Sequence, residues 1–337
     1  MTAGDATPES GLDTAPEADD TAISEQRAAR VKELVRTLSG ASAVGIAKAC
    51  PVSPEAVEQY RRWTAAGRHG PMAYMTNHQV IRDDPRLLLD GAQSIIVEAF
   101  PYYHPEPQWR SRRRIARYAR GEDYHTVIRS RLSRAAEAIS AELGGAWRVC
   151  VDTAPIRERY WAVQAGLGFT GRNNTLIIPG QGSYFFLGEI ITTLPLSPDA
   201  PCTLTCGDCL RCLHACPAGA LTPAAPHSPM EGQLPTAPTA LDARKCLSCL
   251  TIEHRGDFPH PLNLHGRIAG CDTCQEVCPH NAQPPTGLPE FAPANPLLTL
   301  SDQELEAAPP STLKPVLKHS ALSRIRPADL LRNISHS

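Results

Sequence analysis

The sequence predicts an α+β protein in three parts: a mixed-sheet domain with helices, a cysteine-rich domain and a short helical C-terminal tail. Three observations lead to this prediction. Strand and helix patterns alternate over the first two hundred or so residues, as in a sheet covered by helices. Ten of the twelve cysteines then lie between Cys202 and Cys278, where hydrophobic periodicity is weak. Three weak helical patterns follow from Gln283 onward.

Shifts in composition set the predicted boundaries. The acidic stretch over residues 1–22 is rich in Ala, Thr and Pro, and we expect it to be a disordered tail. The sheet domain then spans 23–200, the cysteine-rich domain 201–283 and the C-terminal extension 284–337. Within the cysteine-rich domain, the proline-rich stretch 222–241 is typical of a surface insertion.

The elements of the sheet domain follow from periodicity and from capping residues. Val31, Leu34 and Leu38 share one face of a helix that Ser24 can cap and Gly40 can end. The last two strands flank a Pro-Gly turn, so at least part of the sheet is expected to be antiparallel. In chain order, the predicted elements are a helix over 25–39, a strand over 43–49, a helix over 54–67, a strand over 94–100, a helix over 124–143, a strand over 147–153, a helix over 155–165 and two strands within 174–194.

The cysteines of the second domain have the spacing of iron–sulfur ligands. One run reads C-x2-C-x2-C-x3-C-P from Cys206, and another reads C-x2-C-x3-C-P from Cys271. In two-cluster ferredoxins the fourth cysteine of such a run binds the other cluster. This rule gives one ligand set of Cys206, Cys209, Cys212 and Cys278, and a second of Cys216, Cys246, Cys271 and Cys274. Structural zinc is the alternative, because C-x2-C pairs also build four-thiolate zinc sites.

A run of arginines between Trp109 and Arg120 is the strongest basic feature of the chain. Guanidinium groups suit phosphates, and the interleaved aromatic rings can stack on bases, so the run predicts contact with RNA. A solvent-exposed helical face is the alternative interpretation. The residues expected to contact RNA are Arg112, Arg113, Arg114, His254 and Arg255.

Charge and hydropathy limit the class of protein. The formal net charge is −2, so any nucleic-acid surface has to be local. No apolar stretch reaches the ~18 residues of a transmembrane helix, and the N-terminus lacks the basic and apolar regions of a signal peptide. We therefore expect no membrane association, a cytoplasmic location, and cysteines that bind metal rather than form disulfides.

Several motifs resemble those of the epoxyqueuosine reductase family. They include HGPMAYM and RDDPRLLL over 69–89, YARGEDYH over 118–125, and VDTAPIRERYWAVQAGLGFTGRNNTLI over 151–177. The cysteine-rich domain adds DARKCLSCLTIEHRG and GCDTCQEVCPHN. Order, spacing and residue type agree from about Ala41 to Asn281, and SALSRIRPADLLRN matches more weakly near the C-terminus.

The resemblance implies cofactors, a substrate and a reaction. Members of the family bind cobalamin in the first domain, beside a ferredoxin-like domain with two [4Fe–4S] clusters. They reduce epoxyqueuosine at the wobble position of tRNA to queuosine, with electrons from an external donor that low-potential clusters can pass to cobalt. Asp152 matches the proton donor of the family, a role that calls for a raised carboxyl pKa. Alternatively, Asp152 only caps the helix that follows.

The resemblance also implies which residues contact the corrinoid. Arg82 matches a family position at the cofactor, although Arg82 and Arg157 could instead form surface ion pairs. Tyr124 and His125 are expected in the same pocket, unless His125 is an ordinary core histidine. The full expected set is Arg82, Ala116, Tyr124, His125, Asp152, Arg157, Leu176, Leu187, Ser248 and Asp272.

Two other functions fit parts of the pattern. A reductive dehalogenase would share the corrinoid and cluster chemistry, but such enzymes usually carry a twin-arginine export signal that this N-terminus lacks. A non-catalytic ferredoxin-like electron carrier would need neither Asp152 nor a domain of this size. We therefore expect an oxidoreductase that acts on tRNA as a monomer.

Overall fold

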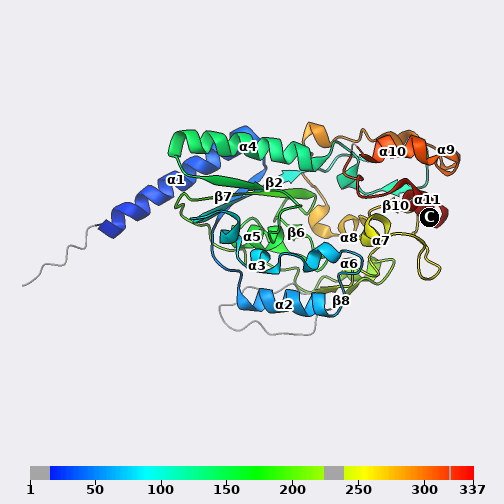
Figure 1. Ribbon diagram of the computed structural model, residues 1–337, viewed down its shortest axis with the longest axis horizontal. Helices are drawn as coiled ribbons and strands as arrows, with labels where there is room; N and C mark the ends of the chain where they lie inside the picture. The colour runs from blue at the N-terminus through cyan, green and yellow to red at the C-terminus, as the bar shows by residue number, and fades with distance from the viewer. Residues whose placement is uncertain (1–15, 224–238, 319) are drawn as a thin grey trace, which may run out of the picture.

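The computed structural model describes residues 16–223, 239–318 and 320–337 (Figure 1). Residues 1–15 of the predicted tail and 224–238 of the predicted insertion lie outside the described residues. A four-stranded sheet with its helices forms one end of the molecule. The cysteine-rich domain and the C-terminal helices lie at the other end (Figure 1).

The central sheet has the strand order β1–β2–β7–β4. Strand β1 spans Ala43–Lys48, β2 Ser94–Pro101, β7 Phe185–Thr192 and β4 Trp147–Cys150. Every residue of β2 is buried, because helices cover both faces of this inner strand. The predicted α+β class is confirmed. However, every pairing in this sheet is antiparallel, so the prediction of a mixed sheet is wrong for it; hydrophobic periodicity does not fix strand direction.

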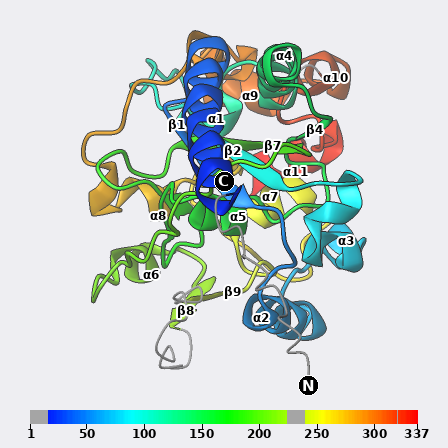
Figure 2. The same cartoon turned by 90° about the vertical axis from the view of Figure 1, so that its left-hand side faces the viewer.

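Helices cover the two faces of the sheet in separate layers (Figure 2). On one face, α1 (Pro16–Ser39) and α4 (Tyr124–Leu143) lie side by side and bury apolar residues such as Val31 against the strands. On the other face, α5 (Glu158–Gln164) buries Trp161 in a second apolar cluster. The sheet domain therefore has two hydrophobic cores, one on each face.

Helix α1 begins at Pro16, so the prediction of a disordered tail is wrong for residues 16–22. A proline followed by acidic residues is a favourable helix start, because proline needs no backbone donor there and carboxylates suit the N-terminal dipole. The helix ends at Ser39, and Gly40 follows with a φ of 76°, as the sequence predicts.

The other elements of the sheet domain are short. They are α2 (Pro54–Ala65), η1 (Ala73–Thr76), α3 (Gln79–Asp83), η2 (Pro85–Leu88), β3 (Arg114–Ile115), η3 (Arg117–Ala119), β5 (Phe169–Thr170) and β6 (Leu176–Ile177). The strand predicted over 147–153 ends at Cys150, and the helix predicted over 155–165 begins only at Glu158. The segment between them is a loop, and it carries Asp152.

The cysteine-rich domain is built from short elements joined by loops. They are α6 (Arg211–Ala215), β8 (Leu221–Pro223), β9 (Thr239–Leu241), α7 (Leu247–Glu253), β10 (Arg267–Ala269), α8 (Thr273–Glu276) and η4 (Pro279–Asn281). Strand β10 pairs in parallel with β3, which lies within the basic run. The alternative of a helical basic face is therefore wrong, because this run contains a short strand and a 3₁₀ turn.

The C-terminal extension packs onto both other parts of the chain. Its elements are η5 (Pro289–Phe291), η6 (Pro296–Thr299), α9 (Asp302–Ala307), α10 (Pro310–Lys318) and α11 (Pro327–Ser335), which include the three predicted helices. Leu313, Leu322 and Leu330 form a third apolar cluster with Ile115 of β3 and Ile268 of β10. The extension therefore shares an apolar cluster with β3 and β10, although its own sequence shows no globular pattern.

Candidate active site

Asp152 lies in the loop after β4 and points at two cations. Its Oδ2 atom is 3.0 Å from Nε2 of His125 and 3.8 Å from Nη2 of Arg324. The backbone of Asp152 has a φ of 46°, a left-handed conformation that aspartate tolerates better than most residues. The loop thus holds a partly exposed carboxylate between cations from two distant parts of the chain.

His125 sits at the start of α4 between two carboxylates. Asp123 caps this helix through its side chain and also lies 2.7 Å from Nδ1 of His125. Burial tends to lower the pKa of His125, but the hydrogen bonds to Asp123 and Asp152 outweigh it and raise the pKa to about 9. The ring of Tyr124 stacks on that of His125 at 4.0 Å. His125 is therefore protonated at neutral pH, which contradicts its interpretation as an ordinary core histidine.

The pKa of Asp152 differs in direction from the one that its expected role suggests. Burial alone would raise this pKa. The hydrogen bond and charge of His125 and the charge of Arg324 have a larger, opposite effect, so the pKa of Asp152 lies below its ordinary value. The expectation of a raised Asp152 pKa is wrong, because the neighbouring cations stabilise the ionised carboxylate. The proton of this pair resides on His125.

Glu158 supports the Asp152 loop through a hydrogen bond to its backbone. The backbone amide of Asp152 donates to Oε1 of Glu158 at 2.6 Å. Burial and the nearby charge of Asp152 raise the pKa of Glu158 to about 7. Helix α5 has Arg157 at its N-cap position, so the alternative in which Asp152 caps this helix is wrong. The loop is fixed by Glu158 instead.

The other residues expected at the corrinoid fall into separate groups. Arg157 pairs with Asp83 and lies over the ring of Tyr60, so it forms a buried ion pair rather than a surface one. Arg82 is more exposed and binds the carbonyl of Asn77. Leu176 and Leu187 belong to the apolar cluster beside α5.

Ala116, Asp272 and Ser248 lie nearer the cysteine-rich domain. The amide of Ala116 donates to Ala269, and the amide of Arg117 donates to the buried carboxyl of Asp272 at 2.8 Å. Burial raises the pKa of Asp272 to about 6. Ser248 lies in the first turn of α7.

The first predicted ligand set surrounds a single cavity. Cys206, Cys209, Cys212 and Cys278 all line one pocket, together with Arg172 and other residues. The amide of Arg172 points at Sγ of Cys206 at 3.4 Å. Burial raises the pKa of Cys212 to about 11, and the charges of Cys206 and Cys278 add to the shift. These four thiols therefore face one another.

The second predicted set is also brought together. Burial raises the pKa of the Cys246 thiol, and Cys271 and Cys216 raise it further by charge. Burial also raises the pKa of the Cys274 thiol, and the charges of Cys271 and Cys246 add to the shift. In the described residues, no three His, Cys, Asp or Glu side chains are close enough to bind one metal ion.

The arginines expected to bind RNA differ in exposure. The Arg112 side chain is 95% exposed, whereas that of Arg113 is 12% exposed and bonds Glu306 and Ser337. Arg114 lies over the ring of Trp109 at 4.7 Å. Arg112 is thus the most available of the three, although it also pairs with Asp302.

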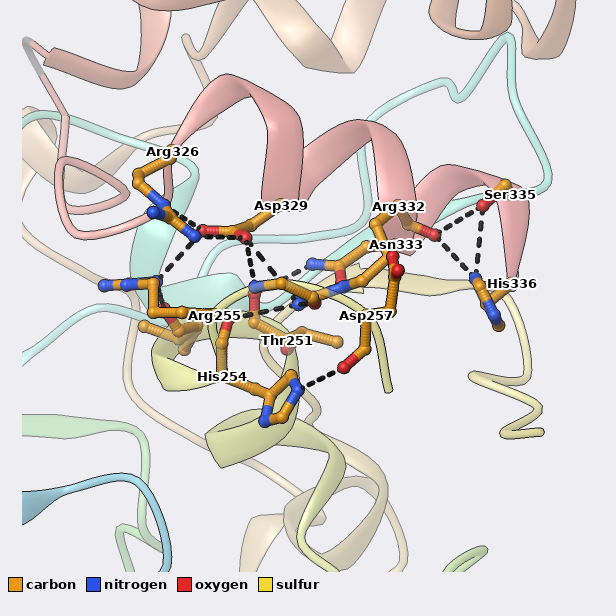
Figure 3. Close-up of polar contacts among 12 residues, drawn as sticks. Thr251, His254, Arg255, Asp257, Arg326, Asp329, Arg332, Asn333, Ser335 and His336 are labelled. Atoms are coloured by element: carbon orange, nitrogen blue, oxygen red, sulfur yellow. Dashed lines mark hydrogen bonds and ion pairs between the residues drawn. The ribbon is translucent and has the colours of Figure 1, made fainter. Parts of the chain in front are cut away.

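His254 and Arg255 belong to an internal network with α11 (Figure 3). Nε2 of His254 lies 2.8 Å from the carbonyl of Asp257. Arg255 donates to the Asp329 carboxylate and to the carbonyl of Arg324. Both side chains therefore stabilise the fold, and Arg255 orients the segment that brings Arg324 to Asp152.

Two residues at this site were not among the expected cofactor or catalytic residues. Arg324 comes from the C-terminal extension, bonds Glu253 at 3.0 Å and lies over the ring of Tyr74 at 4.8 Å. Its only sequence signal is its place in the weakly matching SALSRIRPADLLRN stretch. Glu158 lies within the matching stretch over 151–177, but nothing in that stretch singles it out from its neighbours.

Comparison with known proteins identifies the family of the chain. The family model described as epoxyqueuosine reductase QueG, DUF1730 matches residues 82–153, and that of the 4Fe-4S double cluster binding domain matches 205–281. An epoxyqueuosine reductase of a Synechococcus species is 39% identical over 279 residues, which cover 82% of each chain. That of Leadbetterella byssophila is 38% identical over 285 residues, covering 83% of this chain and 89% of the relative.

Solved structures agree with these sequence relatives. A crystal structure of epoxyqueuosine reductase with an epoxyqueuosine-modified tRNA-Tyr stem loop has a TM-score of 0.77 at 27% identity, and covers 92% of this chain and 80% of that one. The enzyme from Streptococcus thermophilus has a TM-score of 0.76 at 27% identity, covering 91% and 79%. Within the described residues, no helix combines the length and hydropathy needed to cross a bilayer. The chain belongs to the epoxyqueuosine reductase family, with a domain that binds two [4Fe–4S] clusters.

Proposed function

We propose that this protein reduces epoxyqueuosine at the tRNA wobble position to queuosine, with Asp152 delivering a proton to the departing oxygen. The observation that carries the proposal is the contact of Asp152 with His125 and Arg324, in a chain that belongs to this reductase family. The relative crystallised with a modified tRNA stem loop supports tRNA as the substrate. The enzyme is thus an oxidoreductase of tRNA modification.

His125 serves as the proton reservoir of this reaction. Removal of the epoxide oxygen as water consumes two electrons and two protons. Because Asp152 is ionised, its proton comes from Nε2 of His125, which lies 3.0 Å from Oδ2. Asp123 retains the second ring proton on Nδ1 and thereby fixes the tautomer of the neutral imidazole. Asp152 then passes the proton to the oxygen as its carbon bond breaks, and His125 recovers a proton from solvent.

Two [4Fe–4S] clusters carry the electrons, and the two converging thiol sets are their proposed ligands. Soft thiolates are the ordinary ligands of such clusters. The first set is Cys206, Cys209, Cys212 and Cys278, and the second is Cys216, Cys246, Cys271 and Cys274. An external reductant supplies the two electrons that each turnover consumes.

Cobalamin is the cofactor that we propose to bind beside the Asp152 loop. Nε of Arg157 is buried and has no hydrogen-bond partner among the described residues, so it can donate to a polar group of the corrinoid. Leu176 and Leu187 offer apolar surface, and Asp272 can accept from an amide. When bound, cobalamin supplies a strongly reducing cobalt centre. The other expected contacts are Arg82, Ala116, Tyr124, His125, Asp152 and Ser248.

The partners follow from this reaction. Arg112 is the best placed of the predicted arginines for a tRNA phosphate, because its side chain is 95% exposed. His254 and Arg255 contribute to tRNA binding only indirectly, since internal bonds occupy them. A tRNA substrate places the protein in the cytoplasm, and we propose that it acts there as a monomer.

The test is turnover of an epoxyqueuosine-modified anticodon stem loop by the protein purified without oxygen, loaded with cobalamin and given a strong reductant. Nucleoside analysis should show queuosine, and the variant Asp152→Asn should show none above background. Unchanged epoxyqueuosine with a protein that holds both clusters and cobalamin would contradict the proposal. Loss of halide from a halogenated phenol under the same conditions would favour a reductive dehalogenase.

A further inference from the structure

Helix α11 carries a buried polar face, which is unusual for the last helix of a chain. Asp329, Arg332 and Asn333 are 3%, 8% and 0% exposed. The great majority of charged and amide side chains buried at this level have hydrogen-bond partners. Besides contacts within the extension, such as that of Arg326 with Asp329, all three have partners in the cysteine-rich domain, mainly in α7 and the loop after it (Figure 3).

Asn333 joins the two segments that carry ligands of the second cluster. Its Nδ2 atom donates to the carbonyl of Thr251 at 2.8 Å and to that of Ile268 at 2.9 Å. Thr251 lies in α7, which has Cys246 at its N-cap position, and Ile268 lies in β10, just before Cys271. One amide group therefore links the segment behind Cys246 to the segment ahead of Cys271.

A second bond reinforces the same link. The hydroxyl of Thr251 accepts from the amide of Gly270 at 2.9 Å, so α7 holds the residue immediately before Cys271. Arg332 donates to the carbonyls of His254 and Gly256, and Asp329 accepts from the amide of Gly256 at 3.2 Å. These contacts fix the loop that follows α7 against the same helix.

We infer that α11 positions Cys246 and Cys271 for the second [4Fe–4S] cluster, with Asn333 as the main positioning residue. The inference rests on the proposed division of the cysteines between the two clusters. Loss of the Asn333 amide would leave two buried carbonyls without a donor, and the two ligand segments would separate to reach water. The first cluster has a different support, because Asn281 bonds Ser183 and Gln275.

The chain offers a matched control for this role. Asn295 is also buried, at 5% exposed, and its Nδ2 donates to the carbonyl of Ala119 at 3.3 Å. It belongs to the same C-terminal extension but bonds no segment with a predicted cluster ligand. Asn295→Ala therefore creates a comparable defect elsewhere, and its comparison with Asn333→Ala separates positioning from general loss of stability.

The experiment measures iron content and the electron paramagnetic resonance spectrum of dithionite-reduced protein, both independent of turnover. Cys209→Ser and Cys274→Ser serve as references, because each removes one ligand of a single proposed cluster. We expect Asn333→Ala to fall from about eight irons per chain to about four and to match the spectrum of Cys274→Ser. Asn295→Ala should retain about eight irons.

A second pair of variants keeps the inference testable if Asn333→Ala does not fold. Thr251→Val removes the hydroxyl that binds Gly270 with little change in shape, and Thr251→Ser retains it. Thr251→Val should lose the second cluster to a chelator at least tenfold faster than Thr251→Ser. Equal release from the two variants, or loss of both clusters alike in Asn333→Ala and Asn295→Ala, would overturn the role of α11. Indistinguishable spectra of the two cysteine references would overturn the ligand division on which it rests, whatever the substrate.

Discussion

The sheet domain and the cysteine-rich domain are stabilised in different ways. Strand β2 is buried along its whole length, and apolar clusters cover both faces of its sheet. The cysteine-rich domain has helices of only four to seven residues, and its longest, α7, is held by bonds from α11. Such short elements do not bury enough apolar surface to fold alone, so the clusters have to contribute to folding. One region depends on hydrophobic burial, and the other on ligands.

The two regions also differ in whether their buried polar atoms have hydrogen-bond partners. In the sheet domain, both carboxylate oxygens of Glu98 and of Glu189 are buried without a hydrogen-bond partner among the described residues. In the cysteine-rich domain, Asn333 and Thr251 are equally buried, and their polar atoms are satisfied. The sheet domain therefore carries buried groups that cost stability, whereas the polar atoms of Asn333 and Thr251 are paired.

Removal of iron should have the largest effect, and it should unfold one region while the other stays folded. When a chelator strips the clusters without oxygen, the described residues between Cys202 and Cys278 should lose amide protection, while β2 and β7 stay protected. The expected cause is that this segment folds only around its clusters. Hydrogen exchange read by mass spectrometry measures both regions in one sample. Retained protection across these residues after iron loss would show that their protein contacts suffice.

Asp152→Asn should remove catalysis and leave both regions folded. The asparagine keeps the shape of the side chain but cannot carry the proton from His125, so turnover should fall by about 10² to 10⁴-fold. Iron content and hydrogen exchange should match those of the unsubstituted protein. Glu33→Gln, at an exposed ion pair on α1, is the control and should leave turnover unchanged. A decrease of less than tenfold in Asp152→Asn would remove Asp152 from the reaction.

The pH dependence of turnover tests the His125–Asp152 pair. Because the folded-state pKa of His125 is raised to about 9, its ion pairs stabilise the fold fully below the ordinary value near 6.5. That contribution disappears as pH rises through about 9. The value of kcat/KM should decrease over the same window, since His125 then has no proton to pass. The His125→Gln variant should turn over more slowly, and its kcat/KM should no longer decrease as pH rises through about 9. If the decrease remains in this variant, another group causes it.

The sequence could predict what depends on spacing. The strands and helices around Val31, Ser94 and Trp161 follow from periodicity and caps, and each is found in the structure, although the helices of Val31 and Trp161 begin at other residues than predicted. The cysteine spacing likewise gave two thiol sets, and each set converges in the structure. Both kinds of prediction depend on short-range order along the chain.

Contacts between distant segments could not be predicted in this way. Arg324 reaches Asp152 from the other end of the chain, and no local pattern connects them. The same contact, with that of His125, lowers the Asp152 pKa and so reverses the expected direction. The ion pair of Arg255 with Asp329 also joins distant segments, so the sequence could not reveal it. Strand direction in the sheet was missed for the same reason.

The substitution Glu98→Gln should moderately change the pH dependence of stability, and its effect should be confined to the sheet domain. Burial raises the pKa of Glu98 to about 8, so the native state holds a proton that the unfolded state releases above about 4.5. Stability should therefore fall between these two pH values by up to about 1.4 kcal/mol per unit. Glutamine does not titrate and should flatten this slope. Chemical unfolding at pH 5 and pH 8 measures how the free energy of unfolding changes with pH. Equal slopes for the unsubstituted protein and Glu98→Gln would show that Glu98 is not the titrating group.

Arg112→Ala should have the smallest effect, and it separates surface charge from structure within one basic run. An exposed ion pair such as Arg112–Asp302 contributes less than about 1 kcal/mol, so stability should hardly change. Binding of a tRNA stem loop should weaken, and the slope of log Kd against log salt should drop by about one if Arg112 contacts one phosphate.

Arg113→Ala is the matched comparison, because Arg113 is one residue away and carries the same charge but is nearly buried. Its loss removes the ion pair with Glu306 and the bond to Ser337, and it should loosen the C-terminal core, with a lower melting temperature. Each variant should thus change one measurement: salt dependence for Arg112, melting for Arg113. If both variants shift the salt slope equally, the run binds RNA as a diffuse positive surface, and the exposure of individual arginines does not select their roles.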